Sequence, residues 1–112
     1  MMITETEIVA RFTRLEVHVL QRWIAAGWLK PEESGAGFVF GEADIARTYL
    51  IFDLSYEMEL KDEEVAMVLS LVDRLNGTRT VLRAMSAAVQ SQPPQVRDAI
   101  MAEMRALLGS SD

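Results

Sequence analysis

Carboxylates are the chemically active groups that this chain concentrates in one stretch. Residues 41–76 hold nine acidic and three basic residues, a local balance of −6 that equals the net charge of the whole chain. Such carboxylates can exchange protons in acid–base catalysis, or they can attract a basic protein surface. No helix start explains Glu57 and Glu59, so we predict that they contact a partner together with the nearby Asp53.

The remaining composition argues against catalysis. The chain has no Cys and no glycine-rich phosphate loop, and its single His is His18. Helical spacing places His18 on one exposed face with Arg14, Gln21 and Arg22, away from any second catalytic group. Nothing therefore assembles a nucleophile with its base, and the seven Met residues have no soft partner for a metal. We expect no enzymatic activity, no cofactor and no metal site.

Length and charge limit the fold and the partners. A chain of 112 residues with 50% apolar residues can form one compact domain, or a small domain with a helical extension, but not two cores. The net charge of −6 argues against a general affinity for DNA or for anionic membranes. No signal sequence is evident at the N-terminus, and no apolar run approaches the roughly 18 residues of a membrane span. We therefore expect a cytoplasmic protein, which agrees with the absence of Cys.

Two capping patterns predict two short helices near the N-terminus. Thr4–Glu7 and Thr13–Glu16 both fit a capping box, in which a hydroxyl and a carboxylate bond to free backbone amides at a helix start. Glu16 is accordingly interpreted as a capping residue rather than a partner contact. Gly27 is predicted to end the second helix, because glycine readily adopts a positive φ. This arrangement is a helix-turn-helix.

The next segment, from Trp28 to Phe40, predicts a small β-hairpin. Its middle is rich in Pro, Ser and Gly, and it ends in three consecutive apolar residues. Glu32 and Glu33 lie in this expected wing. Trp23 and Trp28 are interpreted as core residues that fill the gap between the second helix and the wing.

Four further helices are predicted. The third covers about residues 42–57, and the fourth begins at Asp62–Glu64, where the helix dipole favours carboxylates. Asn76–Gly77 is predicted to end the fourth helix. A fifth helix follows over 78–90, and a sixth begins after Pro93 and runs to about Leu108.

The last two predicted helices carry apolar stripes that suit either packing within the chain or dimerisation. The stripes consist of Val81, Leu82, Met85 and Val89, and of Val96, Ile100, Met104, Leu107 and Leu108. We favour self-association. The expected organisation is a module over residues 1–76, dimerisation helices over 77–108 and a frayed tail over 109–112.

Several short motifs occur in the order and spacing of a MerR-like winged helix-turn-helix. They are Trp23, Gly27-Trp28-Leu29, Phe38-Val39-Phe40, Asp44-Ile45 and Glu63-Glu64-Val65. The chain therefore resembles the MerR family, and the resemblance implies a mostly α fold with a β-hairpin wing and a C-terminal helical extension.

A closer resemblance comes from two apolar runs, Tyr49–Leu54 and Val65–Leu75. They resemble the chaperone modulators of the CbpM family, and the similarity covers roughly residues 4 to 76. In that family a truncated MerR-like domain binds the J domain of the co-chaperone CbpA. J domains present a basic helix that DnaK also recognises, so the resemblance implies a homodimeric inhibitor that competes with DnaK through acidic residues.

Departures from the DNA-binding MerR pattern support a protein partner. His18 and Gln21 occupy the two positions of the second helix where DNA-binding members usually carry Arg, and the wing Arg is absent as well. Glu32 and Glu33 would repel phosphates from the wing. We therefore predict that these four residues contact a protein.

Two alternatives remain open. Arg11, Arg14, Arg22 and Lys30 lie within the first forty residues and would allow a MerR-like transcription regulator to bind DNA. Such a regulator would lose DNA affinity steeply as salt rises. A dimeric adaptor for some other basic protein fits the acidic charge equally.

Overall fold

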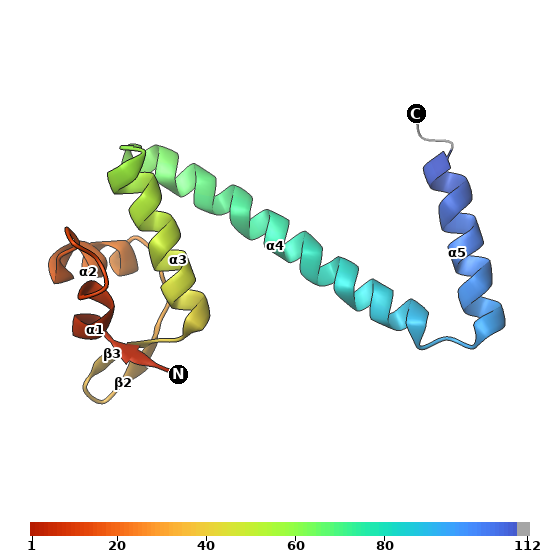
Figure 1. Ribbon diagram of the computed structural model, residues 1–112, viewed down its shortest axis with the longest axis horizontal. Coiled ribbons are helices and arrows are strands. Elements are labelled where there is room, and N and C mark those ends of the chain that lie inside the picture. The colour runs from red at the N-terminus through yellow and green to blue at the C-terminus, as the bar shows by residue number, and fades with distance from the viewer. Residues whose placement is uncertain (110–112) are drawn as a thin grey trace. The chain divides into compact units, whose positions relative to one another are not determined.

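The computed structural model describes residues 1–109, which divide into two units, the first covering Met1–Ser70 and the second beginning at Leu71. The chain is mostly helical, with one small sheet in the first unit (Figure 1). The elements are β1 (Ile3–Thr4), α1 (Glu5–Val9), α2 (Val17–Ala25), β2 (Glu32–Ser34), β3 (Gly37–Phe40), α3 (Glu42–Phe52), the π-helical turn η1 (Asp53–Glu57), α4 (Asp62–Gln90) and α5 (Pro94–Gly109).

The first predicted cap is confirmed and the second is wrong. The Glu7 amide donates to Thr4 Oγ1, and the Thr4 amide donates to Glu7 Oε1, both at 3.2 Å. α2 begins at Val17 rather than at Thr13, and its N-cap residue, Glu16, makes no side-chain capping bond. The interpretation of Glu16 as the carboxylate of a capping box is therefore wrong, because Glu16 stands at the N-cap of α2 rather than three residues inside the helix.

α2 ends as expected at a glycine with a positive φ, since Gly27 has φ +80°. The hairpin that follows is also present: Glu32 pairs with Val39 and Ser34 with Gly37 in antiparallel register. A third strand was not predicted. β1 pairs with the other edge of β3, so that the strand order is β1-β3-β2.

A single core holds the first unit together. β1, α1, α2, β3, α3 and η1 all contribute buried residues to it, among them Trp23, which is 1% exposed, and α4 contributes only its first turns, through Val65 and Leu69. Trp28 packs on this core while half-buried, so both tryptophans fill the positions expected of them. The buried apolar residues are Ile3, Ile8, Leu15, Leu20, Trp23, Leu29, Phe40, Ile51, Phe52, Leu54, Val65 and Leu69.

The predicted helix break at Asn76–Gly77 does not occur. α4 is one helix of 29 residues that passes through both positions, and Gly77 does not adopt a positive φ. Glycine inside a helix costs only about 1 kcal/mol relative to alanine, which is too little to divide a helix that continues on both sides. The hydroxyls of Thr78 and Thr80 donate to the carbonyls of Arg74 and Asn76, one turn earlier.

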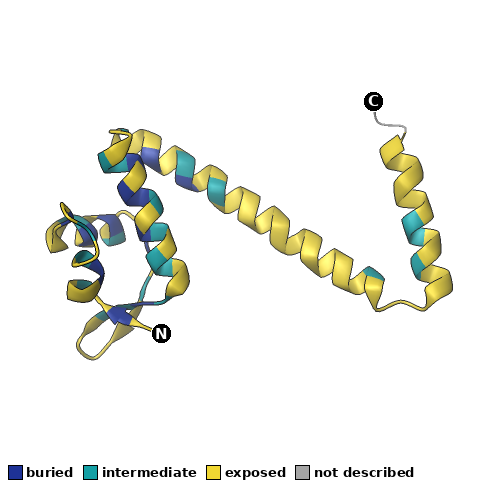
Figure 2. Cartoon of the chain, in the orientation of Figure 1, coloured by how far each residue is buried: buried dark blue, intermediate teal, exposed yellow. Residues whose placement is uncertain are grey.

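The second unit consists of the rest of α4 and of α5. The break between them lies at the predicted place, and Pro94 opens α5 as its first residue. Within residues 71–109 no side chain is buried, and the buried residues of α4 lie only in its first turns (Figure 2). Of the expected frayed tail, Gly109 ends α5, and residues 110–112 lie outside the described residues.

Candidate protein-binding surface

An unusual backbone shape positions the predicted acidic residues at the end of α3. The helix widens into the π-helical turn η1, in which the Met58 amide donates to the Asp53 carbonyl at 2.8 Å. Glu59 then adopts a left-handed conformation with φ +55°. The Leu60 amide donates to the Leu54 carbonyl at 2.9 Å and closes the turn. Single π-helical turns and left-handed non-glycine residues concentrate at functional sites, which makes this junction a candidate.

A substitution at Glu59 tests whether the fold holds this residue in a left-handed conformation that a non-glycine residue disfavours. A non-glycine residue in the left-handed region costs roughly 1–2 kcal/mol, whereas glycine adopts it freely but loses more entropy on folding. We predict that Glu59→Gly stabilises the protein by up to about 1 kcal/mol, measured as the free energy of unfolding in urea. Glu63→Gly is the matched control and is expected to destabilise by up to about 1 kcal/mol, because glycine is a poor helix former and Glu63 lies in the first turn of α4, where the helix dipole favours a carboxylate. Destabilisation by both changes would contradict a left-handed Glu59.

Aromatic rings lie side by side beside η1. Phe12 lies 4.6 Å from Tyr49 and 4.7 Å from Phe52, measured between ring centroids, and Phe52 stacks on Tyr56 at 4.5 Å with an interplanar angle of 12°. Tyr56 in turn forms a T-shaped pair with Trp23, with ring centroids 6.3 Å apart and an interplanar angle of 74°. We call Phe12, Tyr49, Phe52 and Tyr56 the aromatic shelf. It ties the turn after α1 to the end of α3.

Glu57 is not a free carboxylate. Arg14 Nη2 donates to Glu57 Oε1 at 3.0 Å, although 43 residues separate the two in sequence. The Arg14 guanidinium also lies 5.4 Å from the ring centroid of Tyr56 and 5.9 Å from that of Phe52. Both side chains remain more than half exposed. One of the predicted contact residues, Glu57, is therefore already paired with a cation of the same chain, Arg14.

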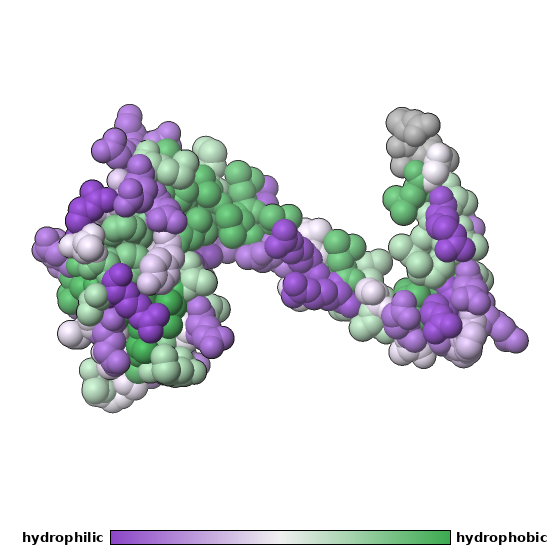
Figure 3. Space-filling model, in the orientation of Figure 1, coloured by the Kyte–Doolittle hydropathy of each residue, from purple (hydrophilic) through white to green (hydrophobic). Residues whose placement is uncertain are grey.

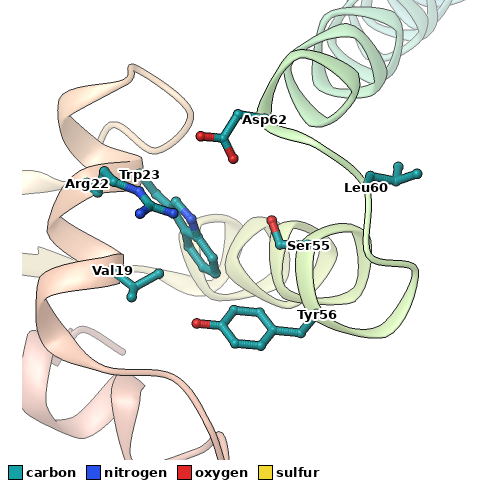
Figure 4. Close-up of a pocket in the computed structure, with 7 residues that line it drawn as sticks. All are labelled: Val19, Arg22, Trp23, Ser55, Tyr56, Leu60 and Asp62. Atoms are coloured by element: carbon teal, nitrogen blue, oxygen red, sulfur yellow. The ribbon is translucent and has the colours of Figure 1, made fainter.

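A groove lies between α2, η1 and the start of α4 (Figure 4). It has a volume of about 180 Å³ and is lined by Val19, Arg22, Trp23, Ser55, Tyr56, Leu60 and Asp62. In Figure 4 the Asp62 carboxylate points across the opening towards the wall that carries Arg22, and the Tyr56 hydroxyl points towards Val19 on α2. A groove with one cationic and one anionic wall suits a polar protein segment better than an apolar ligand.

The acidic start of α4 has a structural role, as its helix-start position suggested. The Lys61 amide donates to Glu64 Oε1 at 2.9 Å, which caps the helix. Asp62 and Glu63 occupy the same first turn, where the helix dipole favours carboxylates. The carboxylates without such a role are Asp53 and Glu59, both exposed, together with the paired Glu57.

The other predicted contacts lie on α2 and on the wing. His18 is exposed, and its Nδ1 lies 3.3 Å from Glu16 Oε2. Gln21 Nε2 donates to Glu5 Oε2 at 3.0 Å, and Glu5 itself lies beside the hairpin turn at Gly37. These contacts bring Gln21 close to the wing through Glu5, a residue that the sequence did not single out.

Glu32 and Glu33 lie on β2, the exposed edge strand of the sheet. Both side chains are exposed, as a contact role requires. A second pocket, with a volume of about 240 Å³, lies next to this strand and is lined by Thr4, Glu5, Thr6, Ser34, Ala36, Phe38 and Val39. Of the predicted residues, Gln21 thus reaches the wing through Glu5, whereas Asp53, Glu57 and Glu59 lie on one short segment at the end of α3.

Residues missed by the sequence interpretation lie mainly around the end of α3. Arg14, Ser55 and Asp62 lie around the junction, and for Arg14 only a tertiary contact reveals this. Arg14 was noted as a basic residue, and no local spacing connects it to Glu57. Aromatic residues at intervals of three and four along α3 were the one signal in the sequence that pointed to the shelf.

Comparisons with known proteins give no family assignment. Neither a scan of protein-family models nor a search of curated proteins found a match to this chain. No helix among residues 1–109 is both long enough and apolar enough to cross a membrane. Within the same residues no group of three or more His, Asp or Glu side chains is placed to hold a metal ion. The class of protein defined here is a mostly helical module with a small antiparallel sheet.

Proposed function

We propose that this protein is a chaperone modulator that binds the J domain of a CbpA/DnaJ-like co-chaperone and inhibits its action with DnaK. The observation that carries the proposal is the junction after α3, where Asp53, Glu57 and Glu59 are exposed on one tightly turned segment. A basic helix would meet several carboxylates there at once. Charge complementarity of this kind speeds encounter and sets specificity.

The fold agrees with the MerR-like origin in this proposal. α1, a short connection, α2 and the β2–β3 hairpin follow one another in the order of a winged helix-turn-helix. We propose that the module keeps this shape while its recognition face binds protein. His18, Gln21, Glu32 and Glu33 would form that face, since none of them offers a cation to a phosphate.

A DNA-binding regulator is the alternative. Gln21 lies on the face that a DNA-binding helix would insert into a groove of DNA, and it is hydrogen-bonded to the carboxylate of Glu5. Glu32 and Glu33 are exposed, and they lie near the hairpin turn in the sequence. Each of these carboxylates would repel phosphate. Arg11, Arg22 and Lys30 are exposed and could supply only a few phosphate contacts. The geometry thus favours a protein partner.

The proposal includes a homodimer through the second unit. Because α4 is continuous, Leu71, Leu75, Thr78, Leu82, Met85 and Val89 repeat at alternating intervals of four and three residues along one helix. This spacing is that of a coiled-coil seam. Leu75, Leu82 and Met85 are 52%, 58% and 60% exposed, and hydrophobic atoms cover parts of α4 and α5 on the face in Figure 3.

A second copy of this chain suits the α4 seam better than a strongly acidic or strongly basic partner protein does. Residues 71–112 hold four acidic and five basic residues, so two copies would meet without strong repulsion. The first unit keeps the acidic excess for the partner. A dimer would therefore present two acidic junctions at once.

Charge reversal at the junction tests the proposed contact. We predict that Glu57→Lys combined with Glu59→Lys slows association with an isolated J domain by about tenfold and flattens the salt dependence of the association rate. The free energy of unfolding should fall by less than about 1 kcal/mol, because the Arg14–Glu57 pair is exposed. Stopped-flow or surface-based kinetics at several salt concentrations measure the first effect, and urea unfolding measures the second.

The control variant changes the net charge by the same amount, but at residues far from the junction in the sequence. Asp98→Lys with Glu103→Lys places two reversals on α5, where both side chains are exposed. This variant should associate at nearly the wild-type rate. Equal slowing by the two double variants would mean that net charge alone acts, and an unchanged rate for the junction variant would remove the junction from the interface.

A further inference from the structure

Arg14 occupies a site whose walls suit a guanidinium group. Glu57 supplies one carboxylate oxygen at 3.0 Å, and the rings of Tyr56 and Phe52 lie 5.4 and 5.9 Å from the guanidinium carbon. The two rings are stacked on each other with an interplanar angle of 12°. Phe52 is buried at 8% exposed and backs the half-buried ring of Tyr56, which supplies most of the accessible aromatic surface beside the carboxylate.

This combination favours arginine over lysine. A guanidinium is planar, bonds to a carboxylate through several N–H groups and stacks on aromatic rings, whereas an ammonium is a compact, strongly hydrated charge. The structure displays the preferred ligand directly, because an arginine of the same chain fills the site. Because a guanidinium already occupies the site, we expect a partner to offer a guanidinium there as well.

The site remains within reach of a partner. The side chain of Arg14 is 55% exposed and that of Glu57 is 59% exposed. Exposed ion pairs contribute little to stability, so a competing cation meets only a small barrier to exchange. One of the predicted contact residues is thus covered by a weakly held, replaceable group.

We propose that Glu57, Phe52 and Tyr56 form a binding site for an arginine side chain of the partner protein, and that Arg14 fills this site while the protein is free. The inference rests on the proposed function, since it takes the partner to be a protein with a basic helix. Binding exchanges one guanidinium for another. Arg14 then acts as a built-in competitor that weakens association and excludes partners that offer only lysine.

Removal of Arg14 tests the competition. Arg14→Ala should bind an isolated J domain about two- to fivefold more tightly than the wild type, the factor that corresponds to losing one exposed ion pair as a competitor. The control is Arg11→Ala, which removes the same charge from the same turn. Arg11 is exposed, and the cation that lies against Glu57 and Tyr56 is Arg14, so the removal of Arg11 should change affinity less than twofold. Weaker or unchanged binding by Arg14→Ala, relative to Arg11→Ala, would overturn the inference.

A charge swap separates competition from stabilisation. Arg14→Glu combined with Glu57→Arg keeps the ion pair and the net charge but places the cation at position 57. The swap should keep the thermal midpoint of the wild type within a few degrees while losing at least tenfold in J-domain affinity, because no carboxylate remains at position 57. Wild-type affinity in the swapped variant would show that the pair only joins two segments, which contradicts a binding site.

A small-molecule probe makes the inference independent of the J domain. Methylguanidinium titrated into Arg14→Ala should shift the ring NMR signals of Tyr56 and Phe52 in a saturable way, and methylammonium should shift them less. The wild type should respond only weakly because Arg14 fills the site. If the wild type does not bind the J domain, the proposed function fails while this titration still decides the site. Absence of a saturable methylguanidinium shift in Arg14→Ala would overturn the inference by itself.

Discussion

Truncation of Trp23 to alanine is expected to destabilise the protein by about 3–5 kcal/mol. Trp23 is 1% exposed in the core of the first unit and forms a T-shaped pair with Tyr56, with ring centroids 6.3 Å apart. Its removal deletes the largest buried side chain and leaves a cavity between α2 and η1. Since small domains are stable by only about 5–15 kcal/mol, the variant should be unfolded in part at 37 °C. Urea unfolding followed by far-UV circular dichroism gives the free energy.

Met67→Ala is the matched control for that experiment. Met67 lies on α4 two residues after the core residue Val65, but its side chain is 65% exposed. Its truncation should change the free energy of unfolding by no more than about 0.5 kcal/mol. A loss below about 1 kcal/mol for Trp23→Ala would contradict the central packing of this side chain.

Glutamate at Leu75 and Leu82 is expected to abolish self-association. If α4 forms the proposed seam, each leucine is buried against the second copy and contributes about 1.5–3 kcal/mol to the free energy of dimerisation. Two leucines per chain make four per dimer, so their loss corresponds to at least about a thousandfold increase in the dimer dissociation constant. Introduced carboxylates would also face one another across the seam. Sedimentation equilibrium at several protein concentrations measures the shift from dimer to monomer.

The control for this variant changes charge equally on another face of the same helix. Asn76→Glu with Ala84→Glu adds two carboxylates at exposed positions outside the stripe. That variant should keep the wild-type association state. A monomeric wild type at every concentration, or an unchanged mass for Leu75→Glu with Leu82→Glu, would refute the α4 seam.

Local patterns predicted the elements whose ends depend on nearby residues. The Thr4–Glu7 capping box, the turn at Gly27, the hairpin and the break before Pro94 all occur where the sequence placed them. Each depends on hydrogen bonds or φ angles within a few residues. Such features are fixed by short-range chemistry and can be inferred without knowledge of the fold.

Two predicted helix boundaries were wrong, although each had a local sequence signal for a helix boundary. Thr13–Glu16 has the composition of a capping box, but α2 begins at Val17. Asn76–Gly77 has the composition of a helix end, but α4 continues through it, because one glycine costs less than ending the helix. Compositional signals state a preference, and helical hydrogen bonds over many residues can exceed it.

The candidate site was predicted in part. The acidic residues after α3 were identified by charge alone, and Asp53 and Glu59 are exposed as a contact role requires. Neither the π-helical turn nor the left-handed Glu59 has a sequence signature that spacing rules detect. The contact of Glu57 with Arg14 joins residues 43 positions apart, so it depends on the tertiary fold. Charge alone indicated the candidate contact residues, and the tertiary fold determines that Glu57 is already paired with Arg14.

Calorimetric titration of the full chain with an isolated CbpA-type J domain tests the central claim most directly, with a matched titration of random duplex DNA at physiological salt. The proposal predicts saturable binding of the J domain, a dissociation constant that rises with salt, and no heat from the DNA. Absence of J-domain binding would contradict the proposed function. DNA binding in its place would support the regulator.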